Sequence, residues 1–308
     1  METGDVANKP KTGRPKSVVT EDMTLNVLLS IQENPITSTR QLGSNLGLSH
    51  TSVHKALKAQ KFHPYKVQLI HELNEDDFDR RIQFCEEMMQ RCIQDPLFKT
   101  KIVFSDEASF SLNGHVNRQN SRYWSDENPH WAQECHTQNP QKINVWAGIV
   151  GFKVIGPFII EGNLNGDRYL DLLRESIVPA ISREFPPEDE EHAVDESIWF
   201  QQDGAPPHFA VNVRDYLDQT FPDQWIGRRG SIEWPARSPD LSPLDYFLWG
   251  YLKSKVYVNR PENLQELSER ILAEARTIDQ QTISRVLNEF YNRLGLCQVA
   301  LGHQFEHL

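Results

Sequence analysis

Long apolar runs are missing from the 308-residue chain, and no run reaches 18 residues, so the sequence predicts no transmembrane helix. The first residues, METGDVANKPKTGRPKS, lack the apolar stretch of a secretory signal, and we expect a protein that stays inside the cell. Cysteine is scarce, with four residues and no CxxC pair, which argues against a zinc site. Cys85 and Cys92 are expected to be buried, reduced thiols, as is typical of cytosolic and nuclear proteins.

An overall excess of positive charge is also missing, since the net charge is −11, and this argues at first against a nucleic-acid partner. The charge is unevenly distributed, however. Residues 1–70 carry nine Lys/Arg and five Asp/Glu, a net of +4, so the remaining residues carry −15. A mildly basic front on an acidic body is compatible with DNA binding by the front alone.

Residues 21–66 have the pattern of a helix-turn-helix domain. A helix over 23–33 shows helical apolar spacing at Leu25, Leu28 and Leu29. A short helix capped by Ser38 or Thr39 then runs to Leu46, Gly47 supplies the turn, and Ser49 caps the following helix. Val53, Ala56 and Leu57 form the apolar face of that second helix.

The polar face of the second helix would enter the major groove, with side chains near its N-terminus on base edges and lysines on phosphates. A three-helix bundle with a solvated basic face is the alternative. The candidate DNA-contacting residues are Arg40, Ser49, His50, Thr51, Ser52, His54, Lys55 and Lys58.

A leader over residues 1–20 carries the sequence KTGRPK at 11–16. Proline and glycine keep such a segment extended, and Arg14 and Lys16 on it suit a narrow minor groove. A solvated leader without DNA contacts is the alternative. Next, residues 67–98 are expected to form a linker helix, in which Phe78, Ile82, Cys85, Met89 and Ile93 recur at helical spacing as core or as an interdomain strut.

Three acids follow apolar segments in the remainder of the chain. A strand over 102–104 leads to Asp106, a strand over 198–202 leads to Asp203, and a short strand over 232–234 precedes a helix that begins at Pro243 and contains Asp245. Further strands are expected over 114–124 and 143–152, as an antiparallel meander after the first strand, with helices over 166–181 and 211–220.

Acids at such positions suit two-metal phosphoryl chemistry. Hard carboxylate oxygens bind Mg²⁺ or Mn²⁺ ions about 3.5–4 Å apart, one activating the nucleophile and one stabilising the leaving oxygen. Each aspartate taken alone also reads as an ordinary turn or cap residue. The joint pattern favours the metal site.

Three blocks of this sequence resemble transposases of the mariner-like superfamily: FSDEASF at 104–110, WFQQDGAPPH at 199–208 and WPARSPDLSPLDYFLWGYLKSKVY at 234–257. The GRPK leader and the helix-turn-helix resemble part of that family's DNA-binding region. The resemblance implies an all-α N-terminal domain and an α/β ribonuclease H-like catalytic domain, a mixed five-stranded sheet flanked by helices, over residues 99–260. Helices over 261–308 would pack on that domain.

By this resemblance Asp106, Asp203 and Asp245 are the catalytic acids and the ligands of two Mg²⁺ or Mn²⁺ ions. Asp240 is the rival for the third place, Glu107 is only a neighbour of the site, and His208 is either an active-site support or a structural residue. The implied activity is that of a metal-dependent endonuclease and polynucleotidyl transferase. It would cleave element-end DNA and transfer the 3′-hydroxyl into target DNA. Terminal inverted repeats, target DNA and a second copy of the chain are the implied partners, and the nucleus is the implied location.

The sequence departs from the family pattern in three ways. The family carries two helix-turn-helix units around the Gly-Arg-Pro arm, whereas this chain begins almost at the arm. The spacing from Asp203 to Asp245 is longer than is common, with the extra length expected over 218–231. The body is acidic. A domesticated or truncated transposase-derived DNA-binding protein and a simple metal-dependent nuclease therefore stay open as alternatives.

Overall fold

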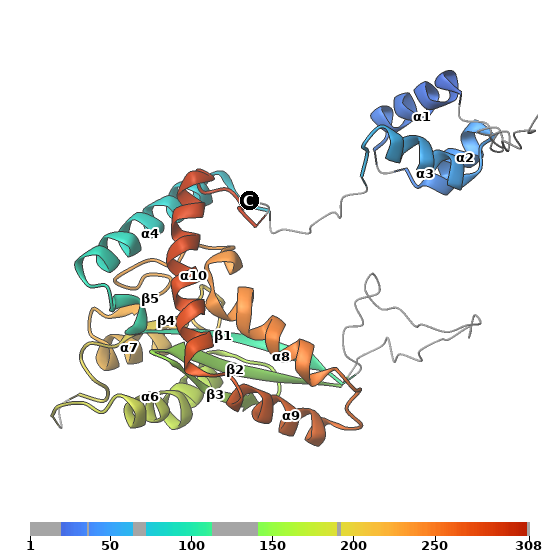
Figure 1. Ribbon diagram of the computed structural model, residues 1–308. Helices are drawn as coiled ribbons and strands as arrows, with labels where there is room; N and C mark the ends of the chain where they lie inside the picture. The colour runs from blue at the N-terminus through green and yellow to red at the C-terminus, as the bar shows by residue number, and fades with distance from the viewer. Residues whose placement is uncertain (1–19, 36, 64–71, 113–140, 190–191, 307–308) are drawn as a thin grey trace, which may run out of the picture. The chain divides into compact units, whose positions relative to one another are not determined.

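The computed structural model describes residues 20–35, 37–63, 72–112, 141–189 and 192–306 (Figure 1). The chain divides into two compact units, Met1–Leu69 and Ile70–Leu308, which are described separately. None of the helices in the described ranges is both long enough and apolar enough to cross a membrane.

The first unit contains three helices, α1 (Glu21–Glu33), α2 (Thr39–Leu46) and α3 (His50–Ala59). The side chain of Ser38 accepts the amide of Gln41 at the start of α2, and that of Ser49 accepts the amide of Ser52 at the start of α3. Gly47 ends α2 with a φ of 65°, a left-handed conformation that glycine adopts without steric cost. The predicted helix–turn–helix order is confirmed.

A small core holds this unit together, and it consists of Val27, Leu42, Val53 and Ala56. The apolar face predicted for α1 was wrong in part, because Leu25 and Leu29 are 56% and 48% exposed and Val27 is the residue that packs inward. A helix turns 100° per residue, so choosing among neighbouring apolar residues requires knowing which side meets α3.

The second unit is built on a mixed five-stranded sheet in the order β3-β2-β1-β4-β5. Its strands are β1 (Ile102–Ser111), β2 (Lys142–Val150), β3 (Lys153–Ile160), β4 (Trp199–Gln201) and β5 (Trp225–Ile226). The first three form an antiparallel meander, whereas β4 pairs in parallel with β1 and β5 in parallel with β4. This is the mixed sheet that the sequence predicted.

Helices cover both faces of the sheet (Figure 1). The α-helices are α4 (Glu75–Gln94), α5 (Gly166–Leu172), α6 (Val178–Glu184), α7 (Val211–Thr220), α8 (Trp249–Val256), α9 (Leu264–Arg276) and α10 (Gln280–Val299). Short 3₁₀ segments lie at η1 (Phe98–Thr100) and η3 (Pro239–Leu241), and π-helical segments at η2 (Leu173–Ile177) and η4 (Leu244–Leu248).

Alternating side chains of β1 enter two separate cores. Ile102 and Phe104 pack with α4, α8, α9 and α10 on one face, whereas Val103 packs with α5, α6 and α7 on the other. Every second residue of β1 therefore belongs to the same side of the sheet, and this alternation decides where the acids of the strand point.

Several predicted boundaries were wrong. The strand predicted over 102–104 continues to Ser111, so its acids lie inside the strand. The short strand predicted over 232–234 is instead β5 at 225–226, and Ile232 contributes only an isolated bridge to Ile226. The stretch 153–160, which was not predicted as a strand, is β3. The strand predicted over 114–124 lies outside the described residues.

The linker helix predicted over 67–98 is the shorter α4, and the apolar residues predicted to be buried on it were partly wrong. Ile93 is 71% exposed, whereas Phe84, Met88 and Cys92 are buried. Cys85 is buried as predicted, and the reason for the difference is that α4 packs along α10, a contact between distant parts of the chain.

Candidate active site

An open cavity of about 400 Å³ lies beside β1 of the second unit, at the point where the neighbouring strand β4 ends. Asp106, Asp203 and Asp245 all line it, together with Glu107. The three predicted acids come from three different elements: the middle of β1, the loop after β4, and the first turn of the helix that continues into α8. The fold therefore brings together acids that are distant in the chain.

The difference in length between β1 and β4 leaves room for this cavity. β4 pairs with β1 only over three residues, from Ile102 to Phe104, whereas the pairing of β1 with β2 continues to Ser111. Ser105 closes the parallel pairing, since its hydroxyl donates to the carbonyl of Gln201 at 2.6 Å. The next residue of β1 is Asp106, which thus has no strand beside it on the β4 side.

Strand alternation sends the two acids of β1 to opposite faces of the sheet. Asp106 shares the face of Ile102 and Phe104, and its Oδ2 accepts the indole N–H of Trp249 at 2.7 Å. Burial raises the pKa of Asp106 well above its usual range, and the neighbouring carboxylates of Asp245 and Glu107 raise it further. Asp106 therefore feels the charge of two other acids that line the same cavity.

Asp203 is held by a tight turn that follows β4. Its Oδ1 accepts the amide of Ala205 at 3.0 Å and contacts Nδ1 of His208 at 2.6 Å. The amide side chain of Gln202 donates to the carbonyl of His208 at 3.1 Å, which fixes the other end of the turn. Burial alone would raise the pKa of Asp203, but the hydrogen bond and the charge of His208 lower it. Asp203 therefore stays ionised.

His208 lies between two carboxylates and is 3% exposed. Besides Asp203, its Nε2 lies 3.2 Å from Oε1 of Glu107, and its ring packs on Tyr169 with centroids 4.2 Å apart. Burial alone would lower the pKa of His208, but Glu107 and Asp203 raise it to about 10. The imidazole is therefore a cation at neutral pH that neutralises part of the charge of the acids.

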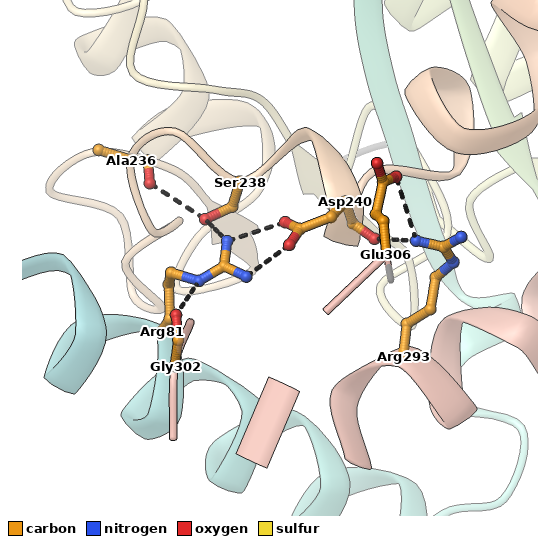
Figure 2. A network of polar contacts seen from close by, with 7 residues as sticks. All are labelled: Arg81, Ala236, Ser238, Asp240, Arg293, Gly302 and Glu306. Atoms are coloured by element: carbon orange, nitrogen blue, oxygen red, sulfur yellow. Dashed lines mark hydrogen bonds and ion pairs between the residues drawn. The ribbon is translucent and has the colours of Figure 1, made fainter. Parts of the chain in front are cut away.

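The two rival aspartates of the SPDLSPLD stretch have different surroundings. Asp245 lines the cavity. Asp240 is 2% exposed, and both of its carboxylate oxygens are bound by Arg81 of α4, at 2.8 and 2.6 Å (Figure 2). A carboxylate held in this bidentate way has little capacity left for an ion.

Arg81 is itself fully buried and connects three parts of the second unit (Figure 2). Besides Asp240, it donates to the hydroxyl of Ser238 at 2.7 Å and to the carbonyl of Gly302 at 2.7 Å. Arg293 of α10 donates to the backbone carbonyl of Asp240 at 2.8 Å. The loop that leads into Asp245 is thus held between α4, α10 and the C-terminal residues.

The residues around the cavity suit a divalent cation. The contacts described above use Oδ2 of Asp106 and Oδ1 of Asp203, so the second oxygen of each carboxylate is the one that would coordinate an ion. Crowded carboxylates are costly without a cation, and hard oxygen donors are what Mg²⁺ and Mn²⁺ prefer. Within the described residues, a tighter group of ligand atoms, all within 4.8 Å, occurs at Asp189, His192 and Glu196, in an exposed acidic loop.

The DNA-contacting residues predicted on α3 lie mainly on its exposed side. In the first unit Arg40, His50 and Thr51 are exposed, as are His54, Lys55 and Lys58, whereas Ser52 is half-buried. The hydroxyl of Ser49 is engaged as the cap of α3. Arg14 and Lys16 lie outside the described residues.

Sequence reasoning missed three residues of the site. Trp249 and Arg81 gave no signal, because each acts on an acid more than 140 positions away. Glu107 was taken as only a neighbour, although it forms an ion pair with His208. The alternation of β1 was the one available signal, since it places Glu107 on the face opposite Asp106.

No protein-family model matches the chain. The chain is similar to the Tc3 transposase of Caenorhabditis elegans, with 25% identity over 63% of this chain and 54% of that protein. It is also similar to the human histone-lysine N-methyltransferase SETMAR, with 21% identity over 97% of this chain and 41% of that protein. The chain thus spans about half the length of these relatives.

Solved structures of the Mos1 transposase share the fold. A Mos1 paired-end complex with left transposon end matches 98% of this chain with a TM-score of 0.72 and 22% identity. The Mos1 catalytic domain matches 78% of this chain with a TM-score of 0.59 and 23% identity. The mixed sheet with its flanking helices is therefore a ribonuclease H-like domain. The chain thus shares the fold of the Mos1 transposase, and the sequence relatives that it matches include transposases.

Proposed function

We propose that the chain is a DNA transposase that cleaves strands at element ends and transfers the resulting 3′-hydroxyl into target DNA. The observation that carries this proposal is that Asp106, Asp203 and Asp245 line one open cavity. Two Mg²⁺ or Mn²⁺ ions bound there would activate the attacking oxygen and stabilise the leaving oxygen. Water and sugar hydroxyls are the nucleophiles, so no covalent link to the protein is needed.

The residues of the chain have separate tasks in this proposal. The three aspartates present carboxylate oxygens, and His208 holds Asp203 in one orientation while balancing its charge. Trp249 fixes Asp106 in the same way from α8. The exposed face of α3 would read element-end DNA, with a second copy of the chain pairing the two ends in the nucleus. Relatives support this in that Mos1 has been solved in a paired-end complex and in a strand transfer complex.

Replacement of Asp245 by asparagine tests the active site. The full chain is incubated with Mn²⁺ and a duplex that carries the inverted repeats flanking its gene, and nicked products are quantified. We expect D245N to lose more than about 100-fold in cleavage rate, because loss of an outer-shell partner alone costs about 10–100-fold. D215N, which alters an exposed acid on α7, is the matched control and should cleave like the parent. Unchanged cleavage by D245N would remove Asp245 from the site.

A second candidate function is DNA binding without transposition. It is favoured by the match of 97% of this chain to part of SETMAR, a protein named for a different activity. In that case the parent would bind the repeat duplex but produce no nicked strand with either Mg²⁺ or Mn²⁺. Nicking without joining of the 3′ end to a target plasmid would instead indicate a simple nuclease.

A further inference from the structure

Three arginines of the second unit surround a single phenyl ring beside the active-site turn. The guanidinium carbons of Arg228, Arg214 and Arg229 lie 4.2, 4.8 and 5.4 Å from the ring centroid of Phe209. These residues come from the first turn of α7 and from the loop after β5. We call Arg214, Arg228 and Arg229 the arginine cluster.

The charges of the arginine cluster are not balanced by nearby acids. Within the described residues, none of its three guanidinium groups lies within ion-pair distance of a carboxylate, whereas Arg80 pairs with Glu233 and Arg237 with Asp77 in the same region. Arg228 and Arg229 are exposed. Three like charges on one ring repel one another, and the cation–π contacts offset this only in part. The cluster therefore favours an anion, in a body that is otherwise strongly acidic.

The arginine cluster is continuous with the active site. Arg228 lies against Gly204, the residue that follows Asp203: an added Cβ there would lie 3.7 Å from the Cβ and Cδ atoms of Arg228. Gly204 lines the cavity of the three aspartates and also a neighbouring cavity of about 390 Å³, which Arg228 lines as well. A polyanion with one phosphate at the aspartates would thus have adjoining phosphates near Arg228.

The loop of Arg228 and Arg229 is held in a fixed shape. Arg229 has a φ of 66°, a left-handed conformation that is costly for a residue with a side chain. Backbone hydrogen bonds from Gly227 to Ile232 and from Gly230 to Gly227, both at 3.0 Å, close the loop. The loop lies within residues 218–231, the stretch where the sequence suggested extra length.

We propose that the arginine cluster binds the phosphate backbone of DNA next to the phosphate at the three aspartates. Phe209 is the platform that holds the guanidinium groups, and its ring is covered by them, so base stacking is not its role. The contact is independent of base sequence, since guanidinium groups recognise phosphate oxygens. This inference deepens the proposed function by supplying a DNA contact on the acidic body itself.

The salt dependence of DNA binding tests the arginine cluster. Affinity of the full chain for a 30-base-pair duplex is measured without Mg²⁺ or Mn²⁺ at about 50–200 mM salt. The logarithm of the binding constant falls with the logarithm of the salt concentration by about 0.9 per phosphate contact. The variant R228Q/R229Q should lower this slope by about 1.8, so the parent should lose roughly tenfold more affinity than the variant across that range.

Matched variants separate phosphate binding from other effects. R183Q/R276Q removes two exposed arginines from the ends of α6 and α9 and should keep the parental slope. R228K/R229K keeps the charge but not the guanidinium geometry and should also keep most of the slope. The proposal would be overturned if R228Q/R229Q kept the parental slope. It would also be overturned if R183Q/R276Q lowered the slope as much as R228Q/R229Q does. A slope in R228K/R229K that is as low as in R228Q/R229Q would likewise overturn it, because the two arginines would then act by packing on Phe209.

Two further points keep this test decisive. If R228Q/R229Q folds poorly by circular dichroism, R229Q alone is used, with an expected drop of about 0.9 in the slope, and no drop overturns the proposal. Binding without catalytic metal does not require cleavage. A changed slope therefore supports the arginine cluster even if the parent never nicks DNA, and an unchanged slope contradicts it even if cleavage is efficient.

Discussion

Two aspartates of one short stretch, Asp240 and Asp245, differ in what surrounds their carboxylates. Asp240 is inaccessible and forms a bidentate pair with Arg81, whereas Asp245 lines the active-site cavity. A paired and fully buried charge contributes to holding the loop in place, and its partner becomes costly if it is left alone. At the scale of single residues, the partner of the carboxylate decides the difference, since an aspartate that is paired with a buried arginine anchors the loop and one that lines a cavity stays accessible to a ligand.

We expect both single substitutions of this pair to destabilise the second unit strongly. R81M or D240L should lower the free energy of unfolding by about 3–5 kcal/mol, because each leaves an unpaired buried charge. The double variant R81M/D240L should be less destabilised than either single variant. Urea unfolding followed by tryptophan fluorescence measures all three. Single variants within about 1 kcal/mol of the parent would contradict the assignment of Arg81 as the anchor of this loop.

Near its own N-terminal end, helix α4 makes a second, more accessible contact with the same loop. Oδ2 of Asp77 accepts the amide of Asn74 at 2.8 Å, and both carboxylate oxygens accept the guanidinium of Arg237 at 2.6 and 2.7 Å. Burial alone would raise the pKa of Asp77, but these bonds lower it below its usual value. α4 therefore holds the loop at two points, through Arg81 and through Asp77.

The lowered pKa of Asp77 gives a pH-dependent prediction. Since the folded pKa lies below the unfolded value of about 3.9, its stabilising effect is complete above that value and is lost as the pH falls through the folded pKa. The Tm of D77N should be below that of the parent by about 2–4 °C at pH 7, corresponding to about 1 kcal/mol. The gap should narrow towards pH 3. A gap that is constant from pH 7 to pH 3 would show that the charge of Asp77 is not its cause.

At the scale of elements, the sequence predicted whether a segment is a helix or a strand better than it predicted where the segment begins and ends. The helix over 211–220 was predicted with the bounds of α7, and the strands around residues 102 and 199 were found in place. The length of β1 was not predictable, because Asp106 and Glu107 look like the end of a strand unless the pairing with β2 is known. β5 at 225–226 was missed for the same reason, since two residues show no periodicity.

For the candidate site, too, the sequence predicted one part and missed another. The three aspartates that line the cavity were predicted from short blocks of sequence, although Asp106 was expected at the end of a strand and lies inside β1. The partner of Asp106 was not predicted, because Trp249 reaches it only across the folded core, and neither was Arg81, which anchors the neighbouring Asp240. Local patterns report which chemistry a segment offers, whereas the contacts that orient it depend on packing between distant segments.

The molecule as a whole consists of two units with separate cores. In the described part of the first unit four buried residues make up the core, whereas in the second unit two large clusters pack on the faces of the sheet. Small cores provide little net stability. The two units therefore differ in how much of their stability they derive from packing.

Residues 70–308 should fold without the first unit. Because the described residues of its two cores all lie after Ile70, the fragment should keep the main thermal transition of the full chain within about 2–4 °C, equivalent to about 1 kcal/mol. Its affinity for element-end DNA should fall, since the exposed face of α3 is gone. Differential scanning calorimetry of both proteins measures the first effect. A main transition lowered by 10 °C or more would show that the units stabilise each other.

The contact of Arg81 with the carbonyl of Gly302 spans 221 residues, and it connects the stretch around residue 302 with the loop that leads to Asp245. Gly302 has a φ of 78° and approaches the backbone of Phe78 so closely that no side chain fits, and Phe305 beyond it is buried. A frameshift or a stop codon after residue 300 would leave Asp106, Asp203 and Asp245 encoded. It would nevertheless remove an acceptor of Arg81 and so loosen the loop that leads to Asp245, which means that a lesion outside the three conspicuous sequence blocks would still disturb the cavity that they form.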